Sequence, residues 1–159
     1  MIAVAMSRAF VKDGEGAELE ELPELVVSPH RNFVTPEGLA LIEATLARLE
    51  SGLSAARAAN DRAAVARTER DLRYWRQRRI SAELVEPETS PPVVRFGCRV
   101  RLVTPDGKPV DFRLVGEDEA DPKRGLISYV SPLAEELLGA TVGDEVRFRG
   151  GTAEVEAIG

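Results

Sequence analysis

The chain has 159 residues, 43% of them hydrophobic, and a formal net charge of −6. This composition allows one or two small domains with a modest core and excludes a chain that is disordered throughout. The acidic balance argues against wholesale electrostatic binding of nucleic acid, because phosphate contacts need clustered Lys and Arg. A single cysteine cannot form an internal disulfide, and a single histidine cannot build a histidine metal site.

The N-terminal stretch carries no sign of a membrane span or a secretion signal. No apolar run approaches the length of a span, and residues 1–5 are too short for the apolar core of a signal peptide. We therefore expect a soluble cytoplasmic protein with no membrane partner, starting at Met1 or Met6. Residues 1–28 are acidic and lack periodicity, which predicts a disordered tail that buries too little apolar surface to offset its ordering entropy.

Residues 35–86 show the clearest period in the chain. Apolar side chains recur there at alternating steps of three and four, which is typical of two helices that share a narrow seam. The seam positions are Leu39, Ile42, Leu46, Leu49, Leu53 and Ala56 in the first half, and Val65, Thr68, Leu72 and Trp75 in the second. Ile80 and Leu84 fit only if the register shifts near the exit.

The ends of both helices carry recognisable signals. Thr35 and Pro36 are suited to the N-cap and the first helical position, Asn60 interrupts the period, and prolines from Pro87 onward end it. A helix of roughly 24 residues is roughly 36 Å long, longer than a small domain needs. We therefore expect residues 29–87 to form an antiparallel coiled-coil hairpin that projects from a globular body, with its tip near residues 60–61.

The second half of the hairpin is rich in arginine. Between residues 57 and 79 there are eight arginines and three acids. One interpretation is a solvated helical surface with intrahelical ion pairs. The other is a basic face for phosphate or for an acidic protein groove. The candidate residues of this basic arm are Arg57, Arg62, Arg67, Arg70 and Arg73.

The C-terminal part changes from a helical to an alternating pattern. After a Pro-rich linker at 88–92, alternation over 94–102 predicts a half-buried strand, with Cys98 as a small core residue. Further strands are expected at 112–115, 126–130 and in a last hairpin that turns at Gly150-Gly151. Ser131 and Pro132 begin a short helix. Residues 93–159 are therefore predicted to be an antiparallel sheet domain with one short helix, and the whole chain to be α+β.

Five motifs, in this order and spacing, carry a resemblance to a known family. They are VTPEGL at 34–39, VRFGCRV at 94–100, RLVGEDEAD at 113–121, ISYVSPL at 127–133 and LGATVGD at 138–144. Together they strongly resemble the bacterial Gre (GreA/GreB) family of transcription factors. The resemblance implies an N-terminal antiparallel coiled coil and an FKBP-like C-terminal domain, meaning one similar to FK506-binding proteins.

The resemblance also implies a partner and a chemistry. Known members bind bacterial RNA polymerase through the C-terminal domain at the rim of the secondary channel, and Val130, Ser131 and Pro132 match the docking loop. Their coiled-coil tip carries acids that help to hold a magnesium ion and a water that cleaves backtracked RNA. Hard oxygen ligands suit that ion.

The sequence departs from the family pattern at the tip. Asp61 matches the tip aspartate, but Ala64 stands where the family has glutamate. Each arm is also about two turns shorter than in the cleavage factors, roughly 12 Å, which places the chain near the relatives called regulators of nucleoside diphosphate kinase. One carboxylate among arginines is a poor magnesium site.

These features lead to three hypotheses. The first is a monomeric regulator of elongation that binds polymerase, with nascent RNA as a candidate second partner, without a metal or cofactor and without enzymatic activity of its own. The second is an active cleavage factor that uses Asp61 and Mg²⁺. The third, a peptidyl-prolyl isomerase, is suggested only by the C-terminal fold, and fold does not imply function. A coiled-coil scaffold would explain the hairpin but not the C-terminal motifs.

Overall fold

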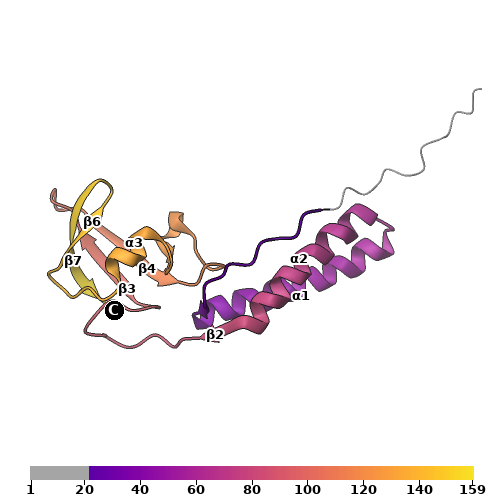
Figure 1. The fold of residues 1–159 in the computed structure, drawn as a ribbon, viewed down its shortest axis with the longest axis horizontal. Coiled ribbons are helices and arrows are strands. Elements are labelled where there is room, and N and C mark those ends of the chain that lie inside the picture. The colour runs from indigo at the N-terminus through magenta and orange to yellow at the C-terminus, as the bar shows by residue number, and fades with distance from the viewer. Residues whose placement is uncertain (1–21) are drawn as a thin grey trace, which may run out of the picture.

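The computed structural model describes residues 22–159 and has two parts, a long helical hairpin and a small sheet domain (Figure 1). Most of the expected acidic tail, residues 1–21, lies outside the described residues. No helix in the described part is long and apolar enough to cross a membrane. In chain order the elements are β1 (Asn32–Val34), α1 (Pro36–Ala58), α2 (Arg62–Ser81), β2 (Ala82–Leu84), β3 (Arg99–Val103), β4 (Pro109–Val115), η1 (Pro122–Arg124), β5 (Leu126–Ser128), α3 (Pro132–Leu137), β6 (Glu145–Phe148) and β7 (Gly151–Ile158).

The hairpin begins as its end signals predict. The Thr35 side chain accepts a hydrogen bond from the backbone N of Gly38 over 3.0 Å, and proline occupies the first helical turn. The turn at the tip is only three residues long. Asn60 adopts a left-handed backbone with φ 54°, which asparagine tolerates better than most residues.

The apolar seam is confirmed over most of its length. Ile42, Leu49 and Leu72 are buried, and Trp75 is half-buried. Ile80 and Leu84, which would fit the seam only with a shift of register, lie outside it, since these residues are 86% and 49% exposed. Three residues after Trp75, the next seam position is instead taken by Arg78.

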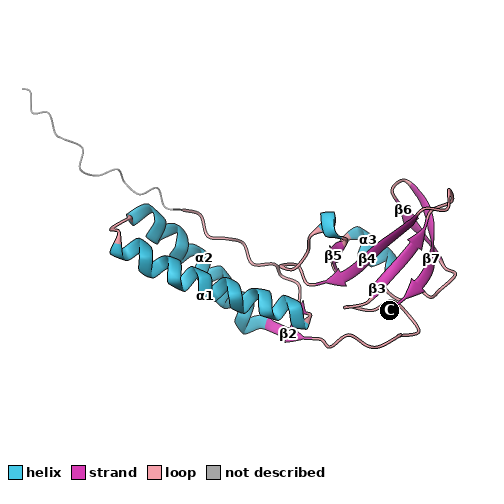
Figure 2. Cartoon of the chain, turned by 180° about the vertical axis from the view of Figure 1, so that it is seen from behind, coloured by secondary structure: helices cyan, strands magenta, loops and turns pink. Residues whose placement is uncertain are grey.

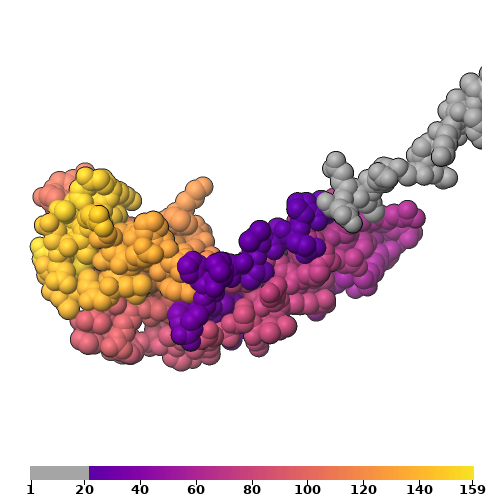
Figure 3. All heavy atoms as spheres, in the orientation of Figure 1, coloured from indigo at the N-terminus to yellow at the C-terminus, as the bar shows by residue number. Residues whose placement is uncertain are grey.

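The second helix also ends earlier than expected, at Ser81 rather than near residue 86. Residues 82–84 leave the helix as β2 and pair in parallel with β1, so that the two strands close the base of the hairpin. From β2 the chain crosses to the sheet domain in an extended connection that includes residues 88–92 (Figure 2). At the other end, residues 22–29 run as an extended segment beside α2 (Figure 3), where Glu24 pairs with Arg73.

The second part is a curled five-stranded sheet in the order β5-β4-β3-β7-β6. Its pairs are antiparallel except for β4–β5, which is parallel because the loop at 116–125 carries the chain back before β5 begins. Helix α3 supplies Ala134 and Leu137 to a core with Leu102, Leu114 and Val155. The α+β class predicted from the sequence is confirmed.

The first long strand is shorter than its alternating pattern suggests, because β3 starts at Arg99 and not at Val94. Gly97 has φ 87° and turns the chain just before the strand. Val94 exchanges backbone hydrogen bonds with residues 139 and 140, beyond α3, over 2.9 and 2.8 Å. Val94 and Cys98 are nevertheless 1% exposed, so both belong to the interior, as predicted for Cys98.

Candidate functional site

Arg78 joins the hairpin to the sheet domain. It is 1% exposed, its Nε donates to Asp118 Oδ2 over 2.5 Å, and its Nη2 donates to Asn32 Oδ1 over 2.7 Å. Asn32 returns a hydrogen bond from Nδ2 to the Arg78 carbonyl oxygen over 2.8 Å. Asp118 lies in the loop after β4, so this network links α2, β1 and the sheet domain.

Two further groups complete the network. The Tyr74 hydroxyl donates to Asp118 Oδ1 over 2.6 Å, and burial, followed by this hydrogen bond, raises the pKa of Tyr74 to about 12. Glu117 Oε2 is buried, has no hydrogen-bond partner among the described residues, and lies 3.8 Å from Arg78 Nη2. The single guanidinium of Arg78 therefore faces two carboxylates, and removing it would leave both uncompensated.

Strand β4 and the loop after it also contact the start of α1. Thr35 Oγ1 donates to Glu119 Oε2 over 2.6 Å, and Arg113 Nη2 donates to Glu37 Oε2 over 3.2 Å. The hydrogen bond from Arg113 lowers the pKa of the Glu37 carboxyl below its usual value. Contacts to both helices therefore fix the direction in which the arm leaves the sheet domain.

An aromatic cluster closes the same junction. The rings of Phe33, Phe96 and Tyr129 lie 5.3 to 5.7 Å apart between centroids, in tilted and edge-on arrangements. The Tyr129 hydroxyl donates to the Arg31 carbonyl oxygen. These rings come from β1, the connection before β3 and the segment after β5, so the junction is apolar as well as ionic.

At the hairpin tip, Asp61 is the N-cap of α2. Its Oδ1 accepts a hydrogen bond from the backbone N of Ala64 over 3.0 Å. The nearest acid along α2 outside this cap, Glu69, accepts from Arg57 over 2.8 Å. Within residues 22–159, no group of three or more His, Cys, Asp or Glu side chains is placed to hold a metal ion.

The basic arm is largely neutralised by acids of the same molecule. Arg57 pairs with Glu69, Arg70 pairs with Asp71 over 2.8 Å, and Arg73 pairs with Glu24 over 2.5 Å. The remaining two arm residues, Arg62 and Arg67, form no ion pair with any residue from 22 to 159. The structure thus places all five arginines on exposed or half-exposed surface of the hairpin without gathering them into one pocket.

The predicted docking residues lie where β5 passes into α3. Pro132 is exposed, Val130 is half-buried, and Ser131 caps α3 by accepting a hydrogen bond from Ala134 N over 3.3 Å. Pro132 borders a hollow of about 790 Å³ between α3 and the sheet. The hollow has apolar walls, among them Phe112, Ile127, Leu133 and Phe148, and the two phenylalanine rings meet edge to face 5.8 Å apart.

Sequence reasoning missed the junction around Arg78, because it counted this arginine with the solvent-exposed ones. The sequence did contain a signal for this site, since Arg78 lies three residues after Trp75 and therefore at the next position of the seam. A charged residue on a seam implies a buried partner. The sequence gives no means of telling that this partner is Asp118, 40 positions away.

The fold and these sites define a protein in which a helical arm is joined to a small sheet domain by buried polar and aromatic contacts. The family model described as "Transcription elongation factor, GreA/GreB, C-term" matches residues 88–158. This match confirms the resemblance to the GreA/GreB family over the sheet domain, which carries four of the five motifs.

Curated relatives match over a similar span. The transcription elongation factor GreA of Novosphingobium aromaticivorans is 44% identical over 66 residues, covering 41% of this chain and 42% of the relative. GreA of Alkalilimnicola ehrlichii is 48% identical over 68 residues, covering 41% and 43%. The alignments thus span about two fifths of the length of the curated relatives that the chain matches.

Solved structures align over more of the chain but less closely. The GreA factor homolog 1 (Gfh1) protein of Thermus thermophilus is 19% identical, covers 82% of this chain and 99% of its own, and superposes with a TM-score of 0.40. The elongation factor GreA/GreB from Nitrosomonas europaea is 22% identical, with coverages of 80% and 98% and a TM-score of 0.40.

Proposed function

We propose that this protein binds bacterial RNA polymerase through its sheet domain and regulates transcription elongation at the secondary channel, in the cytoplasm, without strong transcript cleavage. The match of residues 88–158 to the GreA/GreB C-terminal domain supports the partner. The proposal that cleavage is weak rests on one observation at the hairpin tip, where Asp61 caps a helix among arginines.

The chemistry of the tip supports a role without hydrolysis. A magnesium ion needs near-octahedral oxygen coordination at about 2.0–2.1 Å, and proteins usually hold it through one or two carboxylates that are free to coordinate. Asp61 uses one carboxylate oxygen to accept the Ala64 amide, and Glu69 is held by Arg57. Arg62 follows Asp61 directly, and its positive charge repels a divalent cation. The tip is better suited to contact phosphate or acidic groups than to hold a metal.

The sheet domain is suited to docking. Pro132 is exposed at the rim of the hollow between α3 and the sheet. The phenylalanines in the walls of this hollow give an apolar surface against which a side chain of the partner can pack. The buried network around Arg78 then transmits the docked orientation to the arm. In this way one contact on the sheet domain sets where the hairpin tip points.

The binding part of the proposal is tested by pull-down with core RNA polymerase. We expect the double change Ser131→Ala and Pro132→Ala to weaken binding while circular dichroism stays unchanged. Pro105→Ala is the matched control, because Pro105 is an exposed proline in a turn at the far end of β3. Equal binding by the Ser131/Pro132 variant would place the interface elsewhere.

The regulatory part is tested with stalled elongation complexes that carry labelled transcript. We expect the protein to change pausing or elongation while transcript shortening stays near the intrinsic rate of the polymerase. Cleavage well above that rate, lost in Asp61→Asn, would instead establish the cleavage-factor alternative. Asp61→Asn suits this comparison because asparagine also caps helices, so the fold of the tip is retained.

A further inference from the structure

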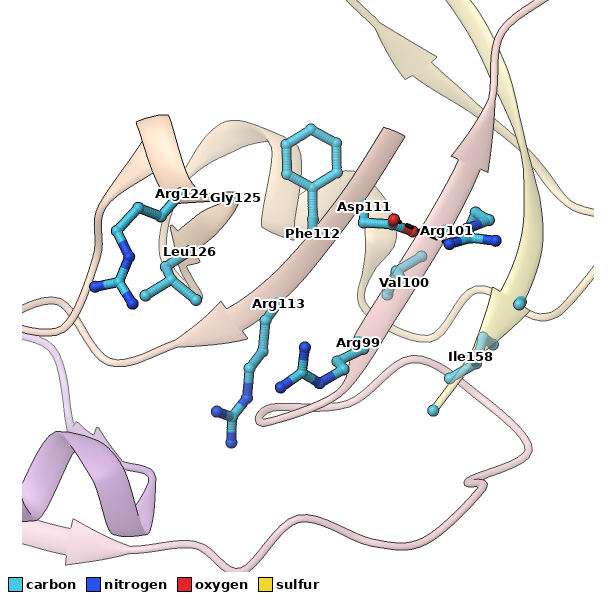
Figure 4. Close-up of a pocket in the computed structure, with 12 residues that line it drawn as sticks. Arg99, Val100, Arg101, Asp111, Phe112, Arg113, Arg124, Gly125, Leu126 and Ile158 are labelled. Atoms are coloured by element: carbon cyan, nitrogen blue, oxygen red, sulfur yellow. Dashed lines mark hydrogen bonds and ion pairs between the residues drawn. The ribbon is translucent and has the colours of Figure 1, made fainter. Parts of the chain in front are cut away.

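The outer face of the sheet carries a pocket that the polymerase-binding proposal does not use. It has a volume of about 390 Å³ and lies over β3, β4 and the loop that leads into β5. Figure 4 shows Arg99 from β3, Arg113 from β4 and Arg124 from η1 reaching to the side away from the Phe112 ring, which points into the core. Leu126 and Ile158 add apolar surface to the walls.

The pocket has an excess of positive charge. Four arginines and one acid, Asp111, line it. Asp111 is already paired with Arg101, which donates to both of its carboxylate oxygens over 2.7 and 3.0 Å. Arg113 donates to Glu37 and to a backbone oxygen. Within residues 22–159, Arg99 and Arg124 have no side-chain hydrogen bond or ion pair. This excess occurs in a chain whose net charge is −6.

The positions of two arginines in this pocket lower the stability of the sheet. Arg99 and Arg113 are directly opposite partners in the β3–β4 ladder, and like charges in opposed positions destabilise a sheet. A neutral or acidic residue at position 99 would relieve the repulsion. An anion that binds between these two guanidinium groups and Arg124 would offset the repulsion.

We propose that this pocket binds an oligophosphate group, either free or as part of a nucleotide. Guanidinium forks match pairs of phosphate oxygens, and three of them neutralise a di- or triphosphate better than a single carboxylate. The volume lies in the range of small-ligand pockets, about 300–1,000 Å³. The apolar walls formed by Leu126 and Ile158 provide a surface for a nucleoside.

Isothermal titration of the full chain with tripolyphosphate and with ATP tests the proposal. We expect Arg99→Gln and Arg124→Gln each to weaken binding by about tenfold or more, because each removes a charge-assisted contact. Arg48→Gln, on the exposed surface of α1, is the matched control for the loss of one charge and should leave the affinity unchanged. Tighter binding of ATP than of tripolyphosphate identifies a nucleotide site, whereas equal binding identifies a site for the phosphates alone.

Thermal unfolding provides a second readout that separates ligand binding from folding. Without ligand, Arg99→Gln should melt at the same temperature as the parent or higher, since the repulsion with Arg113 is removed. With tripolyphosphate, the parent should gain melting temperature by mass action and the variant should not. The proposal is overturned by absence of binding at about 1 mM of either probe, by equal weakening in Arg48→Gln, or by tighter binding of hexaglutamate than of both phosphates.

Discussion

Replacing Arg78 by methionine tests whether the junction network holds the arm on the sheet domain. Methionine keeps most of the side-chain volume and removes only the guanidinium. The change deletes the hydrogen bonds to Asp118 and Asn32 and the positive charge 3.8 Å from Glu117. Because Arg78 is 1% exposed, water cannot replace the lost partners without opening the junction.

The magnitude follows from the contacts. Two charge-assisted hydrogen bonds contribute about 1.5–3 kcal/mol each, and removing one partner of a buried ion pair costs about 3–5 kcal/mol. We therefore expect Arg78→Met to lower the free energy of unfolding by about 3–5 kcal/mol. The double variant Arg78→Met/Asp118→Leu should lose less than the single variant, because it does not leave Asp118 as an unpaired buried charge.

Urea unfolding followed by the fluorescence of Trp75, the only tryptophan, is a direct assay. With an m-value of about 2 kcal/mol/M, the expected loss lowers the midpoint by about 1.5–2.5 M. Arg79→Met is the matched control, since Arg79 is 46% exposed in its pair with Glu43 and such pairs contribute about 0–1 kcal/mol. A loss in Arg78→Met no larger than in this control would refute the network as the element that fixes the arm.

Three further predictions concern the tip, the loop after β4 and alkaline pH. Asp61→Ala should lower stability by about 1 kcal/mol in urea unfolding, whereas Asp61→Ser should retain most of it through the cap. Gly116→Ala should lower stability in urea unfolding by about 1–3 kcal/mol, since the added Cβ would lie 2.4 Å from a backbone oxygen of β1. Its control is Gly52→Ala, which should instead raise stability in the same assay, because an added Cβ at position 52 would meet nothing within 4 Å. The folded pKa of Tyr74 is about 12 against 10.0 for the free side chain. Stability should therefore fall as pH rises from about 10 to 12, where the unfolded chain ionises first and the native Tyr74 stays protonated beside Asp118.

The alkaline prediction has its own control. Tyr74→Phe should flatten the dependence of the unfolding free energy on pH in that window, leaving the smaller contribution of Tyr129, whose pKa burial also raises. An equally steep fall in the Phe variant would assign the effect to other groups. For the tip, an Asp61→Ala variant as stable as the parent would show that the cap seen in the structure does not hold in solution.

Local patterns in the sequence predicted the elements and their ends. Steps of three and four placed Ile42, Leu49 and Leu72 in the interior of the hairpin, and alternation placed Val100 and Leu102 in the interior of the sheet. Capping signals located the first residues of α1 and α3. These signals act over a few residues, so one sequence is enough to recognise them.

The places where the patterns failed are those where distant segments meet. Leu84 continued the apolar pattern but lies 49% exposed, because pairing of β2 with β1 ended the helix at Ser81. Alternation from Val94 predicted a strand, but Val94 found its backbone partners beyond α3. In both cases a contact between segments far apart in the chain overrode the local preference.

Amino-acid order alone determined that this chain is a helical hairpin followed by a small sheet domain, because hydrophobic periodicity and end signals are short-range properties. Only the tertiary structure decided what the arginines do. It buried Arg78 against Asp118, laid Glu24 on Arg73, and set Arg99 opposite Arg113 through the register of the β3–β4 hairpin. Charge interactions depend on which surfaces are brought together and how far they are removed from water, and neither quantity is encoded in the spacing of residues along the chain.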